Sequence, residues 1–291
     1  MKEVNIYLMS FLVDCMSLAS QLDAIRLSIE AKQKNTNELV DKLHDLTDNT
    51  VTKSNALSRA YYRLGLVEKR CMEALISKLN PLRHDNKHQD IELSAIEYSK
   101  AYGVSEKIAY RDLANAVDAL MHRVITTDRA ENKEGRKAFT LMSAAEYKTD
   151  EGRISCEFNY HVVPHLIGMR ERFSSYPLRE SVDFSSSYTW RFYEILVSWA
   201  QPKAKTGGRF TGWIDRQSVE NLREMMGVPQ SYTWQKFQTR VMETAKKELW
   251  EKSNILVTFE RVKTGRKITH LNIKFIEENQ QQLPLQGGDR S

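Results

Sequence analysis

The first fifty residues carry apolar side chains at alternating spacings of four and three, which form one stripe along a helix. Only Lys32 and Thr36 interrupt it. The spacing predicts one long helix, or two helices broken near "KNTN", whose stripe either pairs two chains or docks on its own chain. Because the two polar residues fall within a paired seam, the pattern favours a helix that folds back. The stripe comprises Val4, Leu8, Phe11, Cys15, Leu18, Leu22, Ile25, Ile29, Leu39, Leu43 and Leu46.

A second set of patterns follows from Lys53. Apolar positions from Val67 to Leu79 have helical spacing, and "IELSAIEYSKAYGVSEKIAYRDLANAVDALMHRVIT" indicates a short strand and two helices that meet at Gly103. Alternating runs around Phe139 and Leu141 and around "ISCEF", joined by the turn-rich "KTDEG", predict a β-hairpin. Helix, strand, helix-turn-helix and hairpin is the order of a winged helix.

The same order returns in the last third of the chain. "YTWRFYEILVSWAQ" predicts a helix, "GWIDR" a strand, "SVENLREMMGVPQSYTWQKFQTRVMETAKKELWEK" a helix pair, and "ILVTFERVKTGRKITHLNIKFIEEN" a hairpin. At an offset of 124, Gly103 and Val104 fall on Gly227 and Val228. At that offset Leu113, Val117, Met121 and Ile125 fall on Phe237, Val241, Ala245 and Leu249. The sequence predicts an internal repeat of two winged helices.

We therefore expect an α+β protein with two tandem winged-helix domains behind an N-terminal helical segment. The expected boundaries are 1–50 for the heptad-bearing helical segment, 51–175 for the first winged helix, 176–279 for the second, and 280–291 for a flexible tail. A content of 41% apolar and 28% charged residues suits two compact domains. Three widely spaced cysteines argue against disulfides and zinc clusters and favour a reducing cytoplasm. The run "IYLMSFLVDC" is too short for a membrane span.

The positive charge is concentrated near the second repeat. Residues 203–274 contain fifteen Lys and Arg against seven Asp and Glu, a net of +8, whereas residues 1–50 carry a net of −3. A local positive excess attracts the phosphates of nucleic acid. Because many solvated protein surfaces are basic, the charge alone does not establish DNA binding.

The second helix-turn-helix has residues suited to base contact. If Phe237 and Val241 face the core, Gln238, Thr239 and Arg240 face outward, where Arg can pair with guanine and Gln with adenine. A basic hairpin tip would meet phosphate. Either feature alone would indicate only a solvated face; their joint placement favours DNA. The candidate DNA-binding residues are Ser231, Tyr232, Gln235, Lys236, Gln238, Thr239, Arg240, Lys263, Arg266 and Lys267, with Lys107, Arg111, Lys53 and Asn55 in the first repeat.

The sequence offers little support for an enzyme. The pairs His84 with His88 and His161 with His165 lack the spacing of a metal-binding nicking site, and Pro164 interrupts the second pair. No "GxxxxGK[ST]" phosphate loop occurs. We therefore expect a protein that binds DNA and does not cut it, with neither metal nor cofactor.

Several segments, in order, resemble the theta-type plasmid replication initiators that have two winged-helix domains. These segments are "NALSRAYYRLGLVEKR", "FNYHVVPHLIGMRERFSSYPL", "YTWRFYEIL", "GVPQSY" and "KTGRKITHLNIKF". The resemblance covers roughly Lys53 to Asn279, so the role of the heptad segment is not inherited from it. In that family the base-reading residues follow an aromatic that corresponds to Phe237, which places them here on Thr239 and Arg240.

The resemblance implies a protein that binds repeated origin sites, called iterons, and promotes origin opening. It also implies partners: the host replication initiator, the replicative helicase and host chaperones. A homodimer, formed through the first winged helix and in equilibrium with the monomer, would repress its own promoter. The alternative is a winged-helix transcriptional regulator without a role at an origin; a nicking enzyme is the third interpretation.

Overall fold

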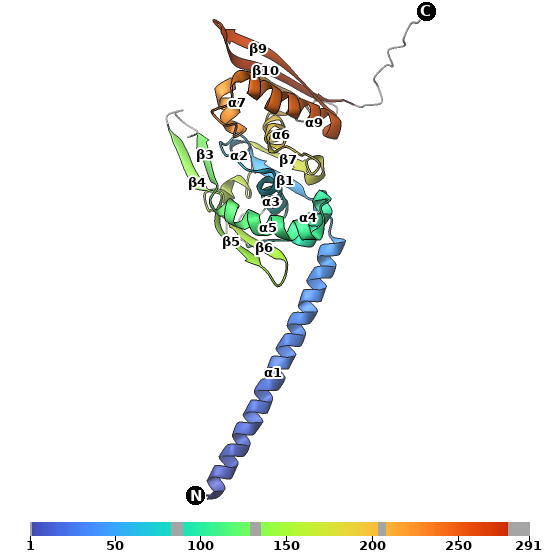
Figure 1. Ribbon diagram of the computed structural model, residues 1–291, viewed down its shortest axis with the longest axis vertical. Helices are drawn as coiled ribbons and strands as arrows, with labels where there is room; N and C mark the ends of the chain where they lie inside the picture. Colours follow the sequence, from blue (N-terminus) through green and yellow to red (C-terminus); the bar gives the residue numbers. More distant parts are fainter. Residues whose placement is uncertain (1, 83–89, 129–134, 203–207, 279–291) are drawn as a thin grey trace, which may run out of the picture. The chain divides into compact units, whose positions relative to one another are not determined.

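The computed structural model describes residues 2–82, 90–128, 135–202 and 208–278 (Figure 1). The chain forms two compact units, Met1–Asp45 and Leu46–Ser291. The first unit is built from α1 (Lys2–Leu43), an uninterrupted helix. The expected break near "KNTN" was wrong. That stretch contains neither Gly nor Pro, and the Thr36 hydroxyl donates to the Lys32 carbonyl at 2.9 Å without ending the helix.

Two three-stranded antiparallel sheets with the same strand order organise the second unit, so the predicted winged-helix repeat is confirmed. The orders are β2-β6-β5 and β8-β10-β9, and in each the strand before the helix pair joins the last strand of the hairpin. The first repeat contains α3 (Leu66–Ser77), β2 (Ile91–Ser94), α4 (Ala95–Tyr102), α5 (Glu106–Met121), β5 (Met142–Lys148) and β6 (Arg153–Phe158). The second contains α6 (Ser187–Trp199), β8 (Thr211–Ser218), α7 (Val219–Met225), α8 (Trp234–Phe237), η5 (Gln238–Glu243), α9 (Thr244–Ser253), β9 (Ile255–Thr264) and β10 (Lys267–Glu277).

Most of the further elements were not predicted, except for the short helix that Ser54 or Asn55 can cap, which is α2 (Asn55–Ser58) with Ser54 as its N-cap. Phe139 lies in a strand that pairs with the strand of Ile125, so this hairpin is separate from β5–β6. Ile125 therefore does not continue α5, which ends at Met121, and its expected match with Leu249 was wrong. The additional elements are η1 (Leu46–Asp48), β1 (Thr50–Ser54), α2 (Asn55–Ser58), β3 (Val124–Asp128), β4 (Arg136–Thr140), η2 (Val163–His165), β7 (Phe173–Pro177) and η3 (Leu178–Glu180).

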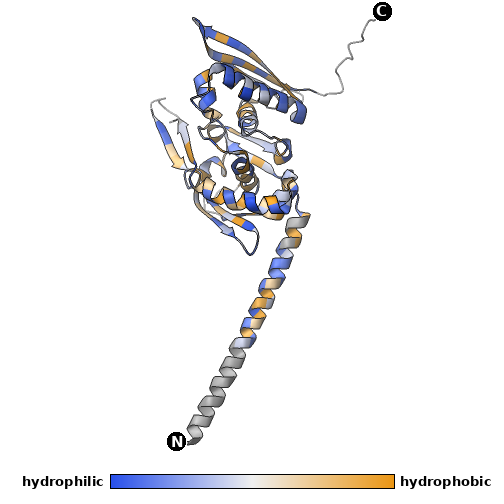
Figure 2. Ribbon diagram, in the orientation of Figure 1, coloured by the Kyte–Doolittle hydropathy of each residue, from blue (hydrophilic) through white to orange (hydrophobic). Residues whose placement is uncertain are grey.

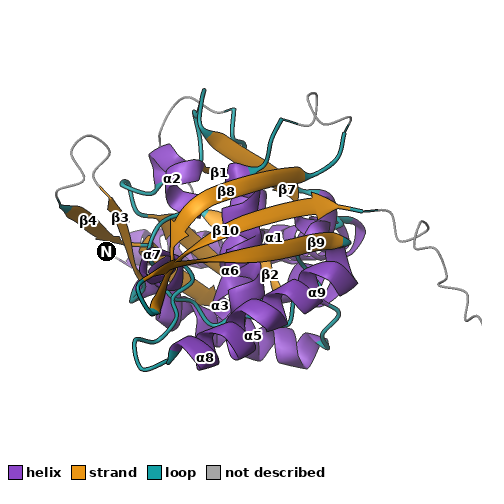
Figure 3. Ribbon diagram, turned by 90° about the horizontal axis from the view of Figure 1, so that it is seen from above, coloured by secondary structure: helices purple, strands orange, loops and turns teal. Residues whose placement is uncertain are grey.

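The strands β8, β10 and β9 lie across α6 and α9 (Figure 3). Helix α6 also contacts α2 and β7, which brings the start of the first repeat against the second. Buried apolar residues of α6, including Trp190, Phe192 and Leu196, belong to one hydrophobic core that extends through both repeats. The two winged helices therefore share part of their interior.

Five charged side chains are buried where the repeats meet, and we call them the buried charge cluster. Lys69 Nζ lies 2.7 Å from both Glu73 and Glu194, and Lys53 Nζ lies 2.9 Å from Glu73 and also donates to Glu194. Arg191 Nη1 donates to Glu194 at 2.5 Å. The Arg191 guanidinium also donates to the backbone carbonyls of Ser58, Ala60 and Met225. The cluster thus connects α3 and β1 with α6 and α7.

Burial and mutual pairing shift the pKa values within this cluster. Burial lowers the pKa of Lys53 to about 8, against the opposing effect of the Glu73 carboxylate. Burial alone would raise the pKa of Glu73, but Lys53 and Lys69 beside it lower that pKa to about 2. The carboxylate is therefore ionised at neutral pH even though no part of it reaches water.

Candidate nucleic-acid interface

The turn between α7 and α8 is fixed by backbone contacts. Gly227 has φ +65°, and a Cβ there would lie 2.9 Å from the Tyr62 carbonyl oxygen. Arg223 donates to the carbonyl oxygens of Tyr232 at 2.5 Å and Pro229 at 3.3 Å. The Thr233 hydroxyl then caps the next helix by accepting from the Lys236 amide. These contacts set where the second helix of the pair begins.

Residues 234–253, which comprise α8, η5 and α9, form the recognition helix of the second repeat. Phe237, Val241, Ala245 and Leu249 are completely buried, as their spacing predicts. The helix packs through this face on α6 and β9. Its opposite face is therefore directed to solvent.

The recognition helix is not α-helical throughout. Residues Gln238–Glu243 form a π-helical turn, with more residues per turn than an α-helix. Val241 and Met242 are both buried in this turn, while Thr239 and Arg240 stay exposed. The Thr239 hydroxyl donates to the Gln235 carbonyl at 2.9 Å. The wide turn therefore occurs at the residues that were expected to read bases.

The predicted contact residues differ in how freely they face solvent. Gln235, Lys236, Thr239 and Arg240 are exposed, and so is Ser231 before the helix. Tyr232 is half-buried and packs against the core. These residues share the N-terminal end of the helix, where a recognition helix contacts DNA.

Gln238 is half-buried and lines a hollow of about 230 Å³ between the recognition helix and β9. Arg261 and Lys246 line the same hollow, and both were missed in the sequence analysis. A signal for Arg261 was present, because strand alternation puts it on the same face as Phe259. Lys246 Nζ lies 5.5 Å from the centre of the Phe259 ring. The basic surface therefore extends from the helix onto the strand.

The wing of the second repeat has a basic tip. Lys263, Arg266 and Lys267 are exposed around the two-residue turn between β9 and β10. Gly265 has φ +61° at the first position of this turn, where a hairpin favours glycine. All three cations are therefore available to an anionic partner.

The corresponding surface of the first repeat differs in charge. Lys107 and Arg111 on α5 are exposed, but Arg111 pairs with Asp112 at 3.1 Å. The tip of this wing carries the exposed acids Asp150 and Glu151 instead of lysines and arginines. An acidic tip repels phosphate, so the helix and wing of this repeat are less suited to DNA.

The structure places Lys53 away from any DNA surface. Its side chain is 1% exposed and belongs to the buried charge cluster, so no phosphate can reach its ammonium group. The expectation of a DNA contact there was wrong, because a strand residue that looked solvated is enclosed by α3 and α6. Asn55, at the start of α2, is half-buried.

The histidines that the structure describes have protein partners. His165 Nδ1 lies 2.8 Å from the Ser54 hydroxyl, and burial lowers the pKa of this histidine. His161 Nδ1 lies 2.9 Å from Lys137 Nζ. His84 and His88 lie outside the described residues. Among the described residues, no three His, Cys, Asp or Glu side chains gather as metal ligands, and no helix is long and apolar enough to cross a membrane.

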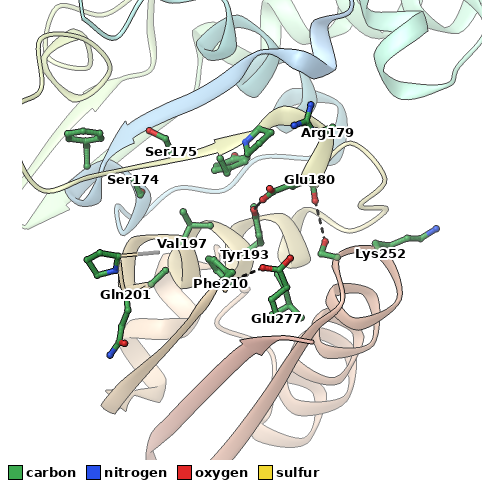
Figure 4. Close-up of a pocket in the computed structure, with 17 residues that line it drawn as sticks. Ser174, Ser175, Arg179, Glu180, Tyr193, Val197, Gln201, Phe210, Lys252 and Glu277 are labelled. Carbon is green, nitrogen blue, oxygen red and sulfur yellow. Dashed lines mark hydrogen bonds between the residues drawn. The ribbon is translucent and has the colours of Figure 1, made fainter. Parts of the chain in front are cut away.

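A crevice of about 570 Å³ lies between β7 and the second repeat (Figure 4). Its polar groups largely bond to one another. The Tyr193 hydroxyl donates to Glu180 at 2.5 Å, the Ser253 hydroxyl to the Glu180 carbonyl at 3.3 Å, and the Phe210 amide to Glu277 at 3.1 Å. The two bonds to Glu180 connect η3 with α6 and α9, whereas the bond from Phe210 to Glu277 lies within the second repeat.

One solved structure shares this architecture over most of its length. The Pi initiator protein, solved in complex with iteron DNA, aligns over 80% of this chain and 98% of its own, with a TM-score of 0.61 and 22% identity. The WH1 domain of MSBI1.176, a replication protein isolated from a multiple sclerosis patient, covers 38% of this chain and 78% of its own at 19% identity and a TM-score of 0.25. The first likeness supports the fold.

Sequence comparisons also indicate two winged-helix domains of a replication protein. An uncharacterized 27.6 kDa protein of Escherichia coli is 21% identical over 225 residues, which cover 74% of this chain and 91% of that protein. The family described as "Initiator Replication protein, WH1" matches residues 50–197, and "Initiator Rep protein, WH2" matches residues 218–275. With both winged helices matched in order, the chain belongs to the family of initiator replication proteins.

Proposed function

We propose that this protein initiates plasmid replication by binding iterons through its second winged helix. The observation that carries the proposal is the exposure of Thr239 and Arg240 on the recognition helix, together with the exposed basic wing of the same repeat. The relative solved with iteron DNA supports it. Arg240 donates to guanine in the major groove, while Lys263 and its neighbours hold the phosphates.

We further propose the steps that follow DNA binding. The bound protein opens the origin and recruits the host replication initiator and the replicative helicase, with host chaperones as further partners. Monomers bind the iterons, and a homodimer formed through the first winged helix represses the protein's own promoter. These activities belong in a bacterial cytoplasm, and none of them requires a metal, a cofactor or strand cleavage by this chain.

A footprint on the DNA that flanks the gene tests the proposal. We expect several protected segments of one repeated sequence, and we expect a plasmid that carries only the gene and this DNA to replicate. A single protected operator without replication would instead support a transcriptional regulator. Relaxation of supercoiled origin DNA by the purified protein would support a nicking enzyme.

A further inference from the structure

Helix α1 lies outside both family matches, the first of which begins at residue 50. It belongs to a compact unit of its own. Large apolar side chains are nevertheless exposed along it. Figure 2 shows that hydrophobic residues recur along the described part of the helix. On the predicted stripe Leu22, Ile25 and Ile29 are 60%, 55% and 57% exposed, and Leu39 and Leu43 are 54% and 78% exposed. An exposed apolar stripe of this kind marks an interaction surface.

The period of the stripe identifies the shape of its partner. Apolar positions recur every 3.5 residues, whereas an α-helix makes a turn in 3.6 residues. Over each heptad a straight helix drifts by about 20° relative to such a stripe, so only a supercoiled helix keeps it in contact. A second helix wound around α1 satisfies this condition, and a globular surface does not.

The length of α1 restricts which helix can be its partner. It has 42 residues and is about 63 Å long at 1.5 Å per residue. Of the other helices in the described ranges, the longest are the recognition helix, with 20 residues over α8, η5 and α9, and α5, with 16 residues. Each of them is packed in its own winged helix. We propose that α1 pairs with α1 of a second copy of this chain in a two-stranded coiled coil.

The two polar residues of the stripe are compatible with this pairing. The Thr36 hydroxyl already donates to the Lys32 carbonyl at 2.9 Å, so the threonine brings no unsatisfied donor to the interface. The long apolar stem of Lys32 can lie along the partner while its ammonium reaches water. Polar residues at two successive positions of a seam weaken the pair but favour one register.

Pairing through α1 gives each assembly two DNA-reading domains. Once one domain of the pair is bound, the second binds a neighbouring copy of the site at an effective concentration set by the connection between them. The pairing itself needs no DNA, so its test and that of the proposed function are independent.

Sedimentation of the full chain without DNA, with two matched variants, tests the proposal. Ile25→Glu puts a charge on the stripe, whereas Leu27→Glu makes the same kind of change at a residue 66% exposed and off the stripe. We expect self-association in the parent chain, weakened by at least about tenfold in Ile25→Glu because the apolar contact is lost in both copies. Leu27→Glu should associate like the parent.

Three results would overturn the proposal. The first is a parent chain that stays monomeric at every concentration, as expected if α1 docks on its own chain. The second is equal association of all three proteins, which would assign pairing to the first winged helix alone. The third is an equal loss in both variants, which would mean that the stripe is not the contact. Unchanged unfolding of the winged-helix unit in both variants verifies that each variant is folded.

Discussion

The Lys69 ammonium lies 2.7 Å from the Glu194 carboxylate, and neither side chain is exposed to water. The two residues are 125 positions apart, so the pair joins helix α3 of the first repeat to α6. A buried ion pair contributes little net stability, because desolvation offsets the attraction. Removal of one partner is costly, because it leaves a charge in the interior without compensation.

Glu194→Gln should therefore destabilise the protein. The substitution keeps the shape of the side chain but leaves Lys53, Lys69 and Arg191 with one carboxylate among them. We expect the free energy of unfolding in urea to fall by about 3–5 kcal/mol. Glu171→Gln, at an exposed position, is the control and should stay within about 0.5 kcal/mol of the parent. A similar small change in both variants would contradict a structural role for the cluster.

Acid should lower the free energy of unfolding, because Glu73 becomes protonated. The folded-state pKa of about 2 lies below the ordinary value of 4.5, so the folded state favours the ionised carboxylate. The resulting stability is fully present above pH 4.5 and is lost as the pH falls towards 2. Urea unfolding across this range measures the loss. Glu73→Gln should remove this part of the pH dependence, whereas Glu171→Gln should retain it.

Gly227 and its counterpart Gly103 form a matched pair for mutation. Their φ angles are +65° and +61°, so Ala at either position is strained by about 1–2 kcal/mol. At Gly103 nothing lies within 4 Å of the added Cβ, but at Gly227 the Tyr62 carbonyl oxygen would lie 2.9 Å away. Gly227→Ala should therefore lower the free energy of unfolding by more than Gly103→Ala. Equal losses of unfolding free energy in the two variants would mean that the backbone around Tyr62 shifts to accommodate the added methyl group.

Arg240→Ala should reduce sequence discrimination. The side chain is exposed on the recognition helix, so the fold should remain intact. We expect a loss of about 1–3 kcal/mol in binding to the specific site and a much smaller loss on random DNA. Titration of both DNAs at one salt concentration measures the difference. An equal loss on both would assign Arg240 to phosphate contact.

Replacement of Lys263, Arg266 and Lys267 by Ala should weaken binding to all sequences alike. Each lost phosphate contact should flatten the slope of log affinity against log salt by about one unit. The double variant Lys107→Ala with Arg111→Ala, in the first repeat, gives a comparison that should change the slope less. An unchanged slope in the triple variant would show that the second wing does not contact the backbone.

Local patterns in the sequence predicted the winged helices well. The burial of Phe237 and Val241 and the basic hairpin between β9 and β10 both follow from short-range periodicity. The β3–β4 hairpin was missed because β4 exposes most of its side chains and because the run around Phe139 continues directly into β5. Periodicity alone could not separate the two hairpins.

Features that depend on contacts between residues far apart in the sequence could not be predicted. Lys53 looked solvated because its partners Glu73 and Glu194 are 20 and 141 positions away. The π-helical turn was hidden because Phe237, Val241 and Ala245 already fit an α-helix, so their spacing gives no sign of a wider turn. The burial of Lys53 and the π-helical turn lie in the charge cluster and in the recognition helix, where tertiary contacts override local preference.

The buried charge cluster also bears on how the chain folds during synthesis. The ribosome makes Lys53, Lys69 and Glu73 long before Arg191 and Glu194 exist. Enclosing the first three alone would bury two cations with one carboxylate, which desolvation opposes. We therefore expect the nascent first repeat to keep this side hydrated until α6 emerges, so that the cluster is enclosed only when both repeats are present.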